Sequence, residues 1–344
     1  MERILEEFKR KHWRHIRKKP NVSGYSGVLH PRIKDGKEIP GTKCIRIYVE
    51  RKVPLCSLSP RERIPRQLDL GGSSIETDIV VLPKIRFMDG VVRTTPEDHQ
   101  KRYRPVPGGV SCTHKDGTAC TSNFYFRKNG KIYLALNTHC GALENDAQIG
   151  DEWLQPSPSP YDGGLYPDDV VAKLAFYVPT KFNGYKCPYR NFAYKIYKGL
   201  YYLTHFKPYE AINYVDISFG EPINLEDLSF TIYGIEGKVV GKGEHRKGLK
   251  VYKSGRTTAV TEGIIDDPSW NGYVYGRRGT AWYEDCVLVR GECAGGDSGS
   301  PTISIAHSGL LYHGALFAGS DQGVFIYCKV ENIEKIAGVE LVTT

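Results

Sequence analysis

Apolar residues within 1–19 recur at steps of three and four, which is the spacing of one face of an α-helix. The stripe consists of Ile4, Leu5, Phe8, His12 and Ile16. Pro20 marks the end of the predicted helix. Its other face is basic. We therefore expect either a helix packed on its own domain with a solvated basic face, or a docking arm for an acidic partner, nucleic acid or a membrane surface.

From Asn21 the period changes to two, which is the spacing of β-strands. The strands predicted in this part are 22–28, 44–49 and 75–82. The first two are joined through a polar turn at 34–37, which predicts a hairpin. Residues 89–107 are polar and bounded by proline, as is typical of a linker. Residues 1–105 are thus predicted to form a small α+β module.

Beyond Gly108 the pattern is one of short strands separated by Gly, Pro, Asn and Asp, which predicts a β-barrel or sandwich. The predicted strands and hairpins are 119–127 with 131–136, 170–178, 213–219, 253–263, 302–305, 310–318 and 323–329, followed by a helix with Ile333, Ile336 and Val339. In 181–210 lysines alternate with tyrosines. This segment is interpreted as a short helix that covers the barrel or walls a substrate cleft; single-strand nucleic-acid binding by stacking is the alternative.

The most informative motif is Gly-Asp-Ser-Gly-Ser-Pro at 296–301. Its glycines permit a turn in which the amides of Gly296 and Ser298 point toward one oxygen atom, as in an oxyanion hole. A serine hydroxyl on such a turn needs a base to remove its proton. The alternative is a plain surface turn, because Gly, Asp and Ser are common turn formers.

Two other residues have positions that fit this chemistry. His139 follows the strand 131–136 directly, although a lone histidine is more commonly a core or turn residue. Asp216 lies within the apolar segment 213–219, where a carboxylate is costly unless it has a partner; a strand-edge aspartate facing water is the alternative. The order His139, Asp216, Ser298 is one of the known orders of a catalytic triad.

The sequence resembles the chymotrypsin-like, trypsin-fold serine peptidases, in particular a prokaryotic group with an N-terminal extension. The matching pieces are 49–55 (VERKVPL), 145–151 (NDAQIGD), 154–156 (LQP), 161–164 (YDGG), 253–258 (KSGRTT) and 317–320 (FAGS), spread between about residue 20 and Leu341. The resemblance implies a mainly β fold, with a trypsin-like double β-barrel peptidase domain over 106–344 behind the α+β module.

The resemblance also implies roles for individual residues. His139 is expected to be the base, Asp216 its orienting partner and Ser298 the nucleophile, with the oxyanion hole formed by the amides of Gly296 and Ser298. The strand Phe317, Ala318, Gly319, Ser320 is expected to hold the substrate backbone as an added strand. No cofactor and no metal are expected.

The chain departs from the trypsin pattern near the pocket. Cys293 lies five places before Ser298, one more than in trypsin, and Glu292 lies six before it, where trypsin keeps its pocket acid. Glu292 is therefore the candidate for a preference for Lys or Arg before the scissile bond. No activation cleavage motif is evident, so Asp297 is expected to find a partner other than a newly made N-terminus.

The net charge of +8 is concentrated in two segments. Residues 1–20 hold eight basic residues against three acidic ones and 181–210 hold six against one, a net +5 each. No apolar run is long enough to span a membrane, and 1–20 lack the apolar core of a secretory signal, so a cytoplasmic protein is expected. A polypeptide substrate is the expected partner, and a nucleic acid is not. The oligomeric state is not predicted.

Nine cysteines are many for a protein inside cells, where disulfides are expected mainly in hyperthermophiles. The group Cys112, His114, Cys120, His139 and Cys140 has no paired spacing typical of zinc. Bridges Cys112–Cys120 or Cys286–Cys293 across adjacent strands are favoured over a metal site.

The sequence thus predicts a serine endopeptidase that acts through a His-Asp-Ser triad and an acyl-enzyme. The alternative is a trypsin-fold protein that is catalytically weak or inactive and serves as a binding or scaffold module, with nucleic acid as one conceivable partner.

Overall fold

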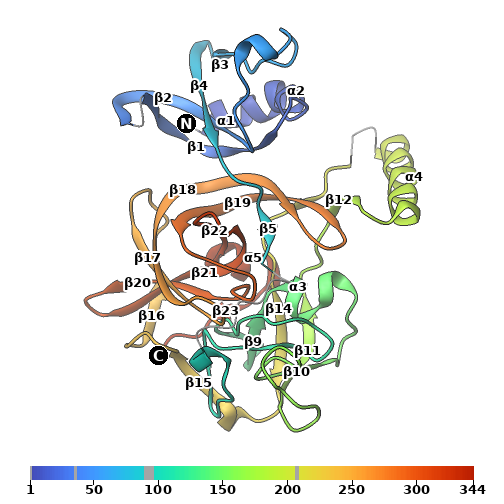
Figure 1. Ribbon diagram of the computed structural model, residues 1–344, viewed down its shortest axis with the longest axis vertical. Coiled ribbons are helices and arrows are strands. Elements are labelled where there is room, and N and C mark those ends of the chain that lie inside the picture. The colour runs from blue at the N-terminus through green and yellow to red at the C-terminus, as the bar shows by residue number, and fades with distance from the viewer. Residues whose placement is uncertain (1, 35–36, 89–96, 206–208) are drawn as a thin grey trace.

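The computed structural model describes residues 2–34, 37–88, 97–205 and 209–344 (Figure 1). The chain is mainly β, as predicted. Its helical segments are α1 (Glu2–Phe8), the π-helical η1 (Lys9–Trp13), α2 (Arg14–Ile16), α3 (Thr138–Gly141), α4 (Pro188–His205) and α5 (Val330–Ala337), with 3-10 turns η2 (Leu55–Ser57), η3 (Glu97–Gln100), η4 (Leu143–Asn145) and η5 (Leu225–Asp227).

The larger sheet joins the N-terminal module to the C-terminal half of the chain. Its strands, in spatial order, are β12 (Phe182–Tyr185), β19 (Gly279–Gly291), β22 (Val324–Lys329), β21 (Gly309–Ser320), β20 (Pro301–Ala306), β17 (Lys250–Gly255), β18 (Ala259–Tyr275), β1 (Val22–Lys34), β2 (Lys37–Val49), β4 (Ser73–Val81) and β3 (Gln67–Leu70). Because β18 also pairs with β19, the six strands from β19 to β18 close into a barrel.

The second sheet is built from the preceding part of the chain and from its C-terminal end. Its strands, in spatial order, are β23 (Glu340–Leu341), β8 (Tyr125–Lys128), β9 (Lys131–Leu136), β14 (Ser218–Pro222), β11 (Val170–Tyr177), β10 (Glu152–Leu154) and β7 (Thr113–His114). Two short strands, β6 (Val106–Gly108) and β15 (Leu228–Ile232), pair with each other. The predicted hairpin across 128–130 is β8 and β9, and the predicted terminal helix is α5, whose Val330 and Ile333 are buried.

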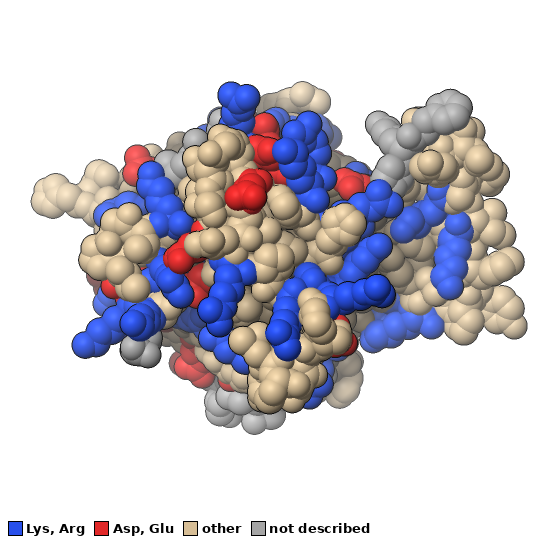
Figure 2. Space-filling view, turned by 90° about the horizontal axis from the view of Figure 1, so that it is seen from above, with Lys and Arg blue, Asp and Glu red and all other residues tan. Residues whose placement is uncertain are grey.

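The N-terminal helix packs on its own module. Phe8, Trp13 and Ile16 are buried, and the Trp13 ring lies 4.6 Å from that of Tyr25 and 5.4 Å from that of Trp282. Viewed from above, the Lys and Arg side chains of this face are interrupted by acidic and uncharged residues (Figure 2). The expectation of a packed helix with a solvated basic face is therefore confirmed, and the shared contact with Trp282 ties the helix to the barrel strand β19.

Strand β18 connects the module with the barrel. It pairs with β1 through Gly24, Tyr25 and Ser26, while its other partners belong to the barrel. The predicted hairpin 22–28/44–49 is β1 and β2, and the predicted strand 75–82 is β4. The boundary near residue 105 stays a prediction, because the module continues the barrel sheet instead of standing apart from it.

Three expectations need correction. No element was predicted between Pro83 and the linker that begins at residue 89, but this segment contains the strand β5 (Arg86–Phe87), which pairs with both β18 and β21. Residues 89–96 of the predicted linker lie outside the described residues. Segment 181–210 does form a helix, α4, but it stands away from the barrel (Figure 1) and none of its described side chains is buried. Asp216 lies between two strands instead of within one.

No helix in the described ranges combines the length and apolar character needed to cross a bilayer.

The cysteine pairing also differs from the expectation. The bridge is Cys120–Cys140, whereas Cys112, Cys286 and Cys293 are free and buried. The bridge was missed because Cys120 lies on a loop and Cys140 in the helix α3, 20 residues apart, and no strand register links them.

We predict that iodoacetamide labels two thiols, Cys56 and Cys187, in the native protein, because these are the exposed free cysteines. Burial raises the pKa of Cys112 and of Cys293 to about 12, so these thiols are both shielded and un-ionised. Mass spectrometry should count seven labelled cysteines after denaturation without reductant and nine after reduction. Nine labelled cysteines without reductant would contradict the Cys120–Cys140 bridge.

Candidate active site

His139 is presented by a short helix at the end of a strand. Strand β9 ends at Leu136 and α3 begins at Thr138, so the histidine side chain leaves the sheet at its edge. The Thr138 hydroxyl donates to the carbonyl of Ile217 at 2.8 Å, which fixes the start of the helix against the segment that carries Asp216. The local sequence therefore places His139 on a short helix that contacts the segment of Asp216.

Asp216 lies where the chain crosses from one sheet to the other. It follows β13 (Ile212–Asn213), which pairs with β19 of the barrel, and precedes β14 of the second sheet. Its own carbonyl accepts a hydrogen bond from the Asn137 side chain at 2.7 Å, and its N–H donates to Cys328 Sγ at 3.2 Å. Burial raises the pKa of Cys328 well above its ordinary value, so a neutral thiol lies beside the carboxylate.

Ser298 lies on the turn between β19 and β20. Gly296 and Gly299 adopt φ of +99° and +101°, in the region that disfavours residues with a side chain. A Cβ at Gly299 would lie 1.9 Å from the carbonyl oxygen of Thr121. The glycines are thus required both by the backbone conformation and by the close approach of the neighbouring loop.

The three side chains form a connected chain of hydrogen bonds. Asp216 Oδ2 lies 2.5 Å from His139 Nδ1, and His139 Nε2 lies 2.7 Å from Ser298 Oγ. Asp216 Oδ1 also accepts the His139 backbone N–H at 3.2 Å. The carboxylate therefore orients the ring so that Nε2 faces the serine, which is the arrangement needed for removal of the hydroxyl proton.

The turn before Ser298 directs an N–H group at a peptide carbonyl. The N–H of Gly296 donates to the carbonyl oxygen of Met88 at 2.7 Å. Gly296 is the residue expected to contribute the first oxyanion donor. The Met88 carbonyl oxygen thus occupies the position where the carbonyl oxygen of a substrate is expected from the sequence.

Asp297 is held by a buried lysine. Lys253 Nζ lies 3.4 Å from Asp297 Oδ2, and both side chains have zero exposure. The carboxylate also accepts the N–H groups of Thr257 and Thr258 at 2.9 and 3.1 Å and that of Ala294 at 3.0 Å, together with the Thr258 hydroxyl at 2.6 Å. The expected partner other than a new N-terminus is therefore Lys253, within the intact chain.

The disulfide connects the helix of His139 to the loop that contacts the Ser298 turn. Cys140 follows His139 in α3, and Cys120 precedes Thr121. The Thr121 N–H donates to the Ser298 carbonyl at 2.8 Å, and the Thr121 hydroxyl donates to the Gly296 carbonyl at 2.8 Å. The bridge thus ties the helix of His139 to Thr121, which holds the Ser298 turn.

The expected substrate strand is the end of β21, and it is already paired. Ala318 and Gly319 lie opposite Phe87 and Arg86 of β5 in an antiparallel register. The Phe87 ring stacks on His139 at 4.7 Å between centroids. His139, Asp216 and Ser298 are all buried, and the Phe87 ring of β5 covers that of His139.

A cavity of about 310 Å³ adjoins this strand. Its lining includes Met88, Gly295, Gly319, Ser320 and Asp321. Glu292 is exposed and does not line this cavity; its backbone carbonyl accepts the Thr261 hydroxyl at 3.2 Å. The geometry therefore gives no support to Glu292 as a pocket acid, because the extra residue before Ser298 carries its side chain to the surface.

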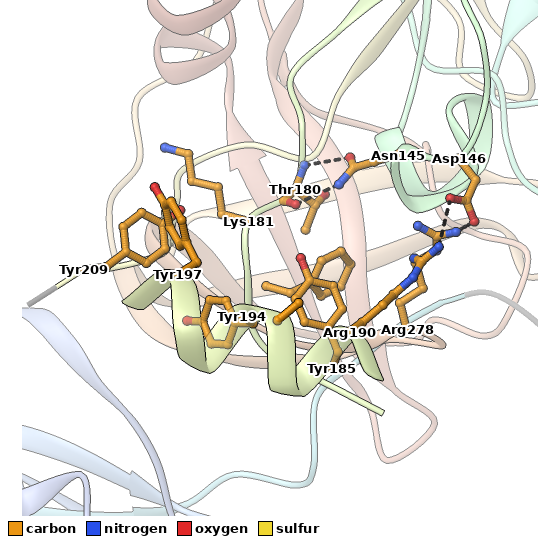
Figure 3. A pocket seen from close by; sticks show the side chains of 12 residues that line it. Asn145, Asp146, Thr180, Lys181, Tyr185, Arg190, Tyr194, Tyr197, Tyr209 and Arg278 are labelled. Carbon is orange, nitrogen blue, oxygen red and sulfur yellow. Dashed lines mark hydrogen bonds and ion pairs between the residues drawn. The ribbon is translucent and has the colours of Figure 1, made fainter. Parts of the chain in front are cut away.

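A second cavity, of about 630 Å³, lies between α4 and the loops that face it (Figure 3). Tyr194 and Tyr197 line it from the helix, and Asn145 and Thr180 exchange hydrogen bonds on the opposite side. The triad residues do not line it. Segment 181–210 is therefore the wall of a separate hollow.

The grouping of Cys120, His139 and Cys140 was considered as a metal site. Their ligand atoms lie within 4.8 Å of one another. The two sulfurs are bonded to each other and the two ring nitrogens face Asp216 and Ser298, so this set offers a metal no thiolate ligand.

Comparison with known proteins gives structural matches only. No family model and no curated protein matches the sequence. Solved structures similar to this chain include Thermobifida fusca protease A (17% identity, TM-score 0.45, covering 70% of this chain and 99% of that one) and a Nocardiopsis protease (20%, 0.46, 69% and 99%). Another is the Cellulomonas bogoriensis chymotrypsin (17%, 0.44, 70% and 99%). At these values we draw no functional conclusion from the likeness.

Sequence reasoning missed two parts of the site. Lys253 was noted only as part of the Lys-Ser-Gly-Arg-Thr-Thr segment. The available signal was Asp297, because a buried carboxylate that has no N-terminal partner needs a cation from elsewhere in the chain. Phe87 and Met88 were missed because two residues are too few for a periodic signal. Three large apolar residues between Lys84 and Asp89, namely Ile85, Phe87 and Met88, were the available hint.

We predict that Lys253→Met lowers the free energy of unfolding by about 3–5 kcal/mol, because it leaves the Asp297 carboxylate buried without its cation. Urea denaturation measures this. Lys250→Met is the matched control: Lys250 lies on the same strand, in an exposed pair with Glu262, and its loss should leave the free energy of unfolding nearly unchanged. Equal effects of the two changes would contradict a structural role for the buried pair.

Proposed function

We propose that the protein is a serine endopeptidase that hydrolyses peptide bonds through an acyl-enzyme. The observation that carries this proposal is the connected chain Asp216, His139, Ser298, with separations of 2.5 and 2.7 Å, next to a glycine turn whose N–H accommodates a peptide carbonyl. The proposal rests on this geometry and on the order of the residues in the chain.

In the proposed reaction each group has one task. His139 Nε2 removes the proton of Ser298 Oγ as the oxygen attacks the substrate carbonyl carbon, and Asp216 stabilises the imidazolium that forms. The amides of Gly296 and Ser298 hold the developing oxyanion, a contribution of about 10²–10³ in turnover for each donor. His139 then protonates the leaving amine, and water repeats the sequence to release the acyl group.

The substrate is proposed to be an extended polypeptide. The edge of β21 from Phe317 to Ser320 pairs antiparallel with a segment of the chain itself, which is the geometry that a peptide added as a strand would adopt. No comparable feature of the described residues favours the alternative of an inactive or nucleic-acid-binding module. The basic face of Figure 2 is broken by other residues, and Lys9 and Lys11 pair with Glu284 and Glu7.

We predict that a fluorophosphonate probe labels Ser298, as established by mapping the modified peptide. Because Phe87 covers the His139 ring, labelling is expected to be faster in a Phe87→Gly/Met88→Gly chain than in the intact wild type. In that opened chain, Ser298→Ala should abolish labelling and His139→Ala should slow it by about 10⁴-fold or more.

The matched controls are Ser59→Ala and His15→Ala, which change exposed residues of the module and should label like the opened chain. Circular dichroism establishes that each variant is folded. A folded, opened chain in which Ser298 reacts no faster than Ser59 would refute the proposed function.

A further inference from the structure

The segment that precedes residue 89 enters the candidate active site as an extended strand. β5 continues from the module strand β4, and Figure 1 shows it descending from the module into the middle of the β units. It lies between two strands: Arg86 pairs in parallel with Tyr275 of β18 and antiparallel with Gly319 of β21. The Tyr275 N–H also donates to the Ile85 carbonyl at 3.0 Å.

The direction and register of β5 are those of a bound peptide. Phe87 and Arg86 lie opposite Ala318 and Gly319, on the strand edge beside Ser298. The Ser298 hydroxyl also lies 3.4 Å from the Phe317 carbonyl, so this edge begins at the nucleophile itself. The chain therefore reaches Ser298 with its next residue, Met88.

The carbonyl of Met88 is the group placed for attack. It accepts the Gly296 N–H at 2.7 Å, on the turn that presents Ser298. A strand that served only to pack against the barrel would need its side chains there and would have no reason to direct a carbonyl at this donor. The contact thus places the Met88 carbonyl where the carbonyl of a reacting substrate is expected.

The side chains of residues 86–88 differ in how far they are buried in the site. The Met88 side chain is buried, 7% exposed, in an apolar cluster that includes Cys293, Leu316 and Phe325. Phe87 is 3% exposed and lies on the His139 ring. Arg86 is exposed. The pocket next to the scissile position therefore accepts a large apolar residue, whereas the side chain two places earlier faces outward.

We propose that the chain cleaves itself on the C-terminal side of Met88. This inference rests on the proposed function and deepens it by naming a first substrate and the residue class that the primary pocket takes. Ser298 Oγ attacks the Met88 carbonyl carbon and gives its proton to His139. The bond from that carbon to the nitrogen of the next residue breaks, and His139 protonates the nitrogen. Water then hydrolyses the ester, which leaves a Met88 carboxylate and a new N-terminus at Asp89.

The cleaved N-terminal part remains bound to the barrel. Residues 1–88 retain the β1–β18 pairing and the contact of Trp13 with Trp282, neither of which involves the scissile bond. The product strand is thus left in the cleft as an inhibitor held by a module, and its departure governs access for other substrates.

Intact mass and N-terminal sequencing test the cleavage. The wild-type chain should yield fragments 1–88 and 89–344, and Ser298→Ala should stay whole. In a mixture, a tagged Ser298→Ala chain should remain whole beside the wild type, because the strand reaches its own site. A wild-type chain that is whole, cut elsewhere, or able to cut the tagged chain at this bond would overturn intramolecular cleavage after Met88.

Variants of the segment test the pocket. Met88→Asp should slow the cleavage at least about tenfold, because a charged side chain enters an apolar site, whereas Met88→Leu should retain it. Val81→Ala, at an exposed position of β4, is the matched control and should cleave like the wild type. Equal rates for Met88→Asp and Val81→Ala would overturn the assignment of Met88 to the pocket.

The failure of this inference can be told from failure of the proposed function. Rapid fluorophosphonate labelling of Ser298 in an opened chain, with no cut after Met88 in the wild type, would leave an active hydrolase and remove the self-cleavage. Absence of both the labelling and the cut would contradict both the proposed function and the self-cleavage.

Discussion

The buried ion pair between Lys253 and Asp297 is the constraint on which the rest of the site depends. In the sequence Asp297 lies directly between Gly296, whose N–H donates to the Met88 carbonyl, and Ser298. A charged carboxylate at zero exposure is tolerated only because a cation and four further donors surround it. The turn is thereby fixed from within the folded chain.

This internal lysine has a consequence for control of the site. Because Asp297 needs no partner created by cleavage, the glycine turn is formed while the N-terminal module is still attached. Access of other substrates to the site must therefore be limited by a segment that occupies the cleft, and not by a distorted glycine turn. The strand β5 supplies this occupancy, with Phe87 over the His139 ring and the Met88 carbonyl on the Gly296 N–H.

Much of the fold could be predicted from the sequence, because turn residues mark the ends of its strands and periodic apolar residues mark its first and last helices. His139 and Ser298 could be named from their positions after a strand and in a glycine turn. The Cys120–Cys140 bridge and the partner of Lys253 could not, because each depends on a contact between segments that are distant in sequence. The strand Arg86–Phe87 is too short for any periodic pattern. Glu292 was misplaced because one extra residue before Ser298 changes which side chains face the pocket.

The most direct measurement of the central claim is the carbonyl carbon resonance of Met88. The chain has two methionines, and only Met88 precedes an aspartate, so labelling with [1-¹³C]methionine and ¹⁵N-aspartate identifies its carbonyl by the splitting from nitrogen. In the folded Ser298→Ala chain we expect this split signal downfield of its position in denaturant, because a hydrogen bond to Gly296 polarises the carbonyl. In the wild type the splitting should be lost and a carboxylate signal should appear. A split signal at the denatured position in the folded Ser298→Ala chain would contradict the account.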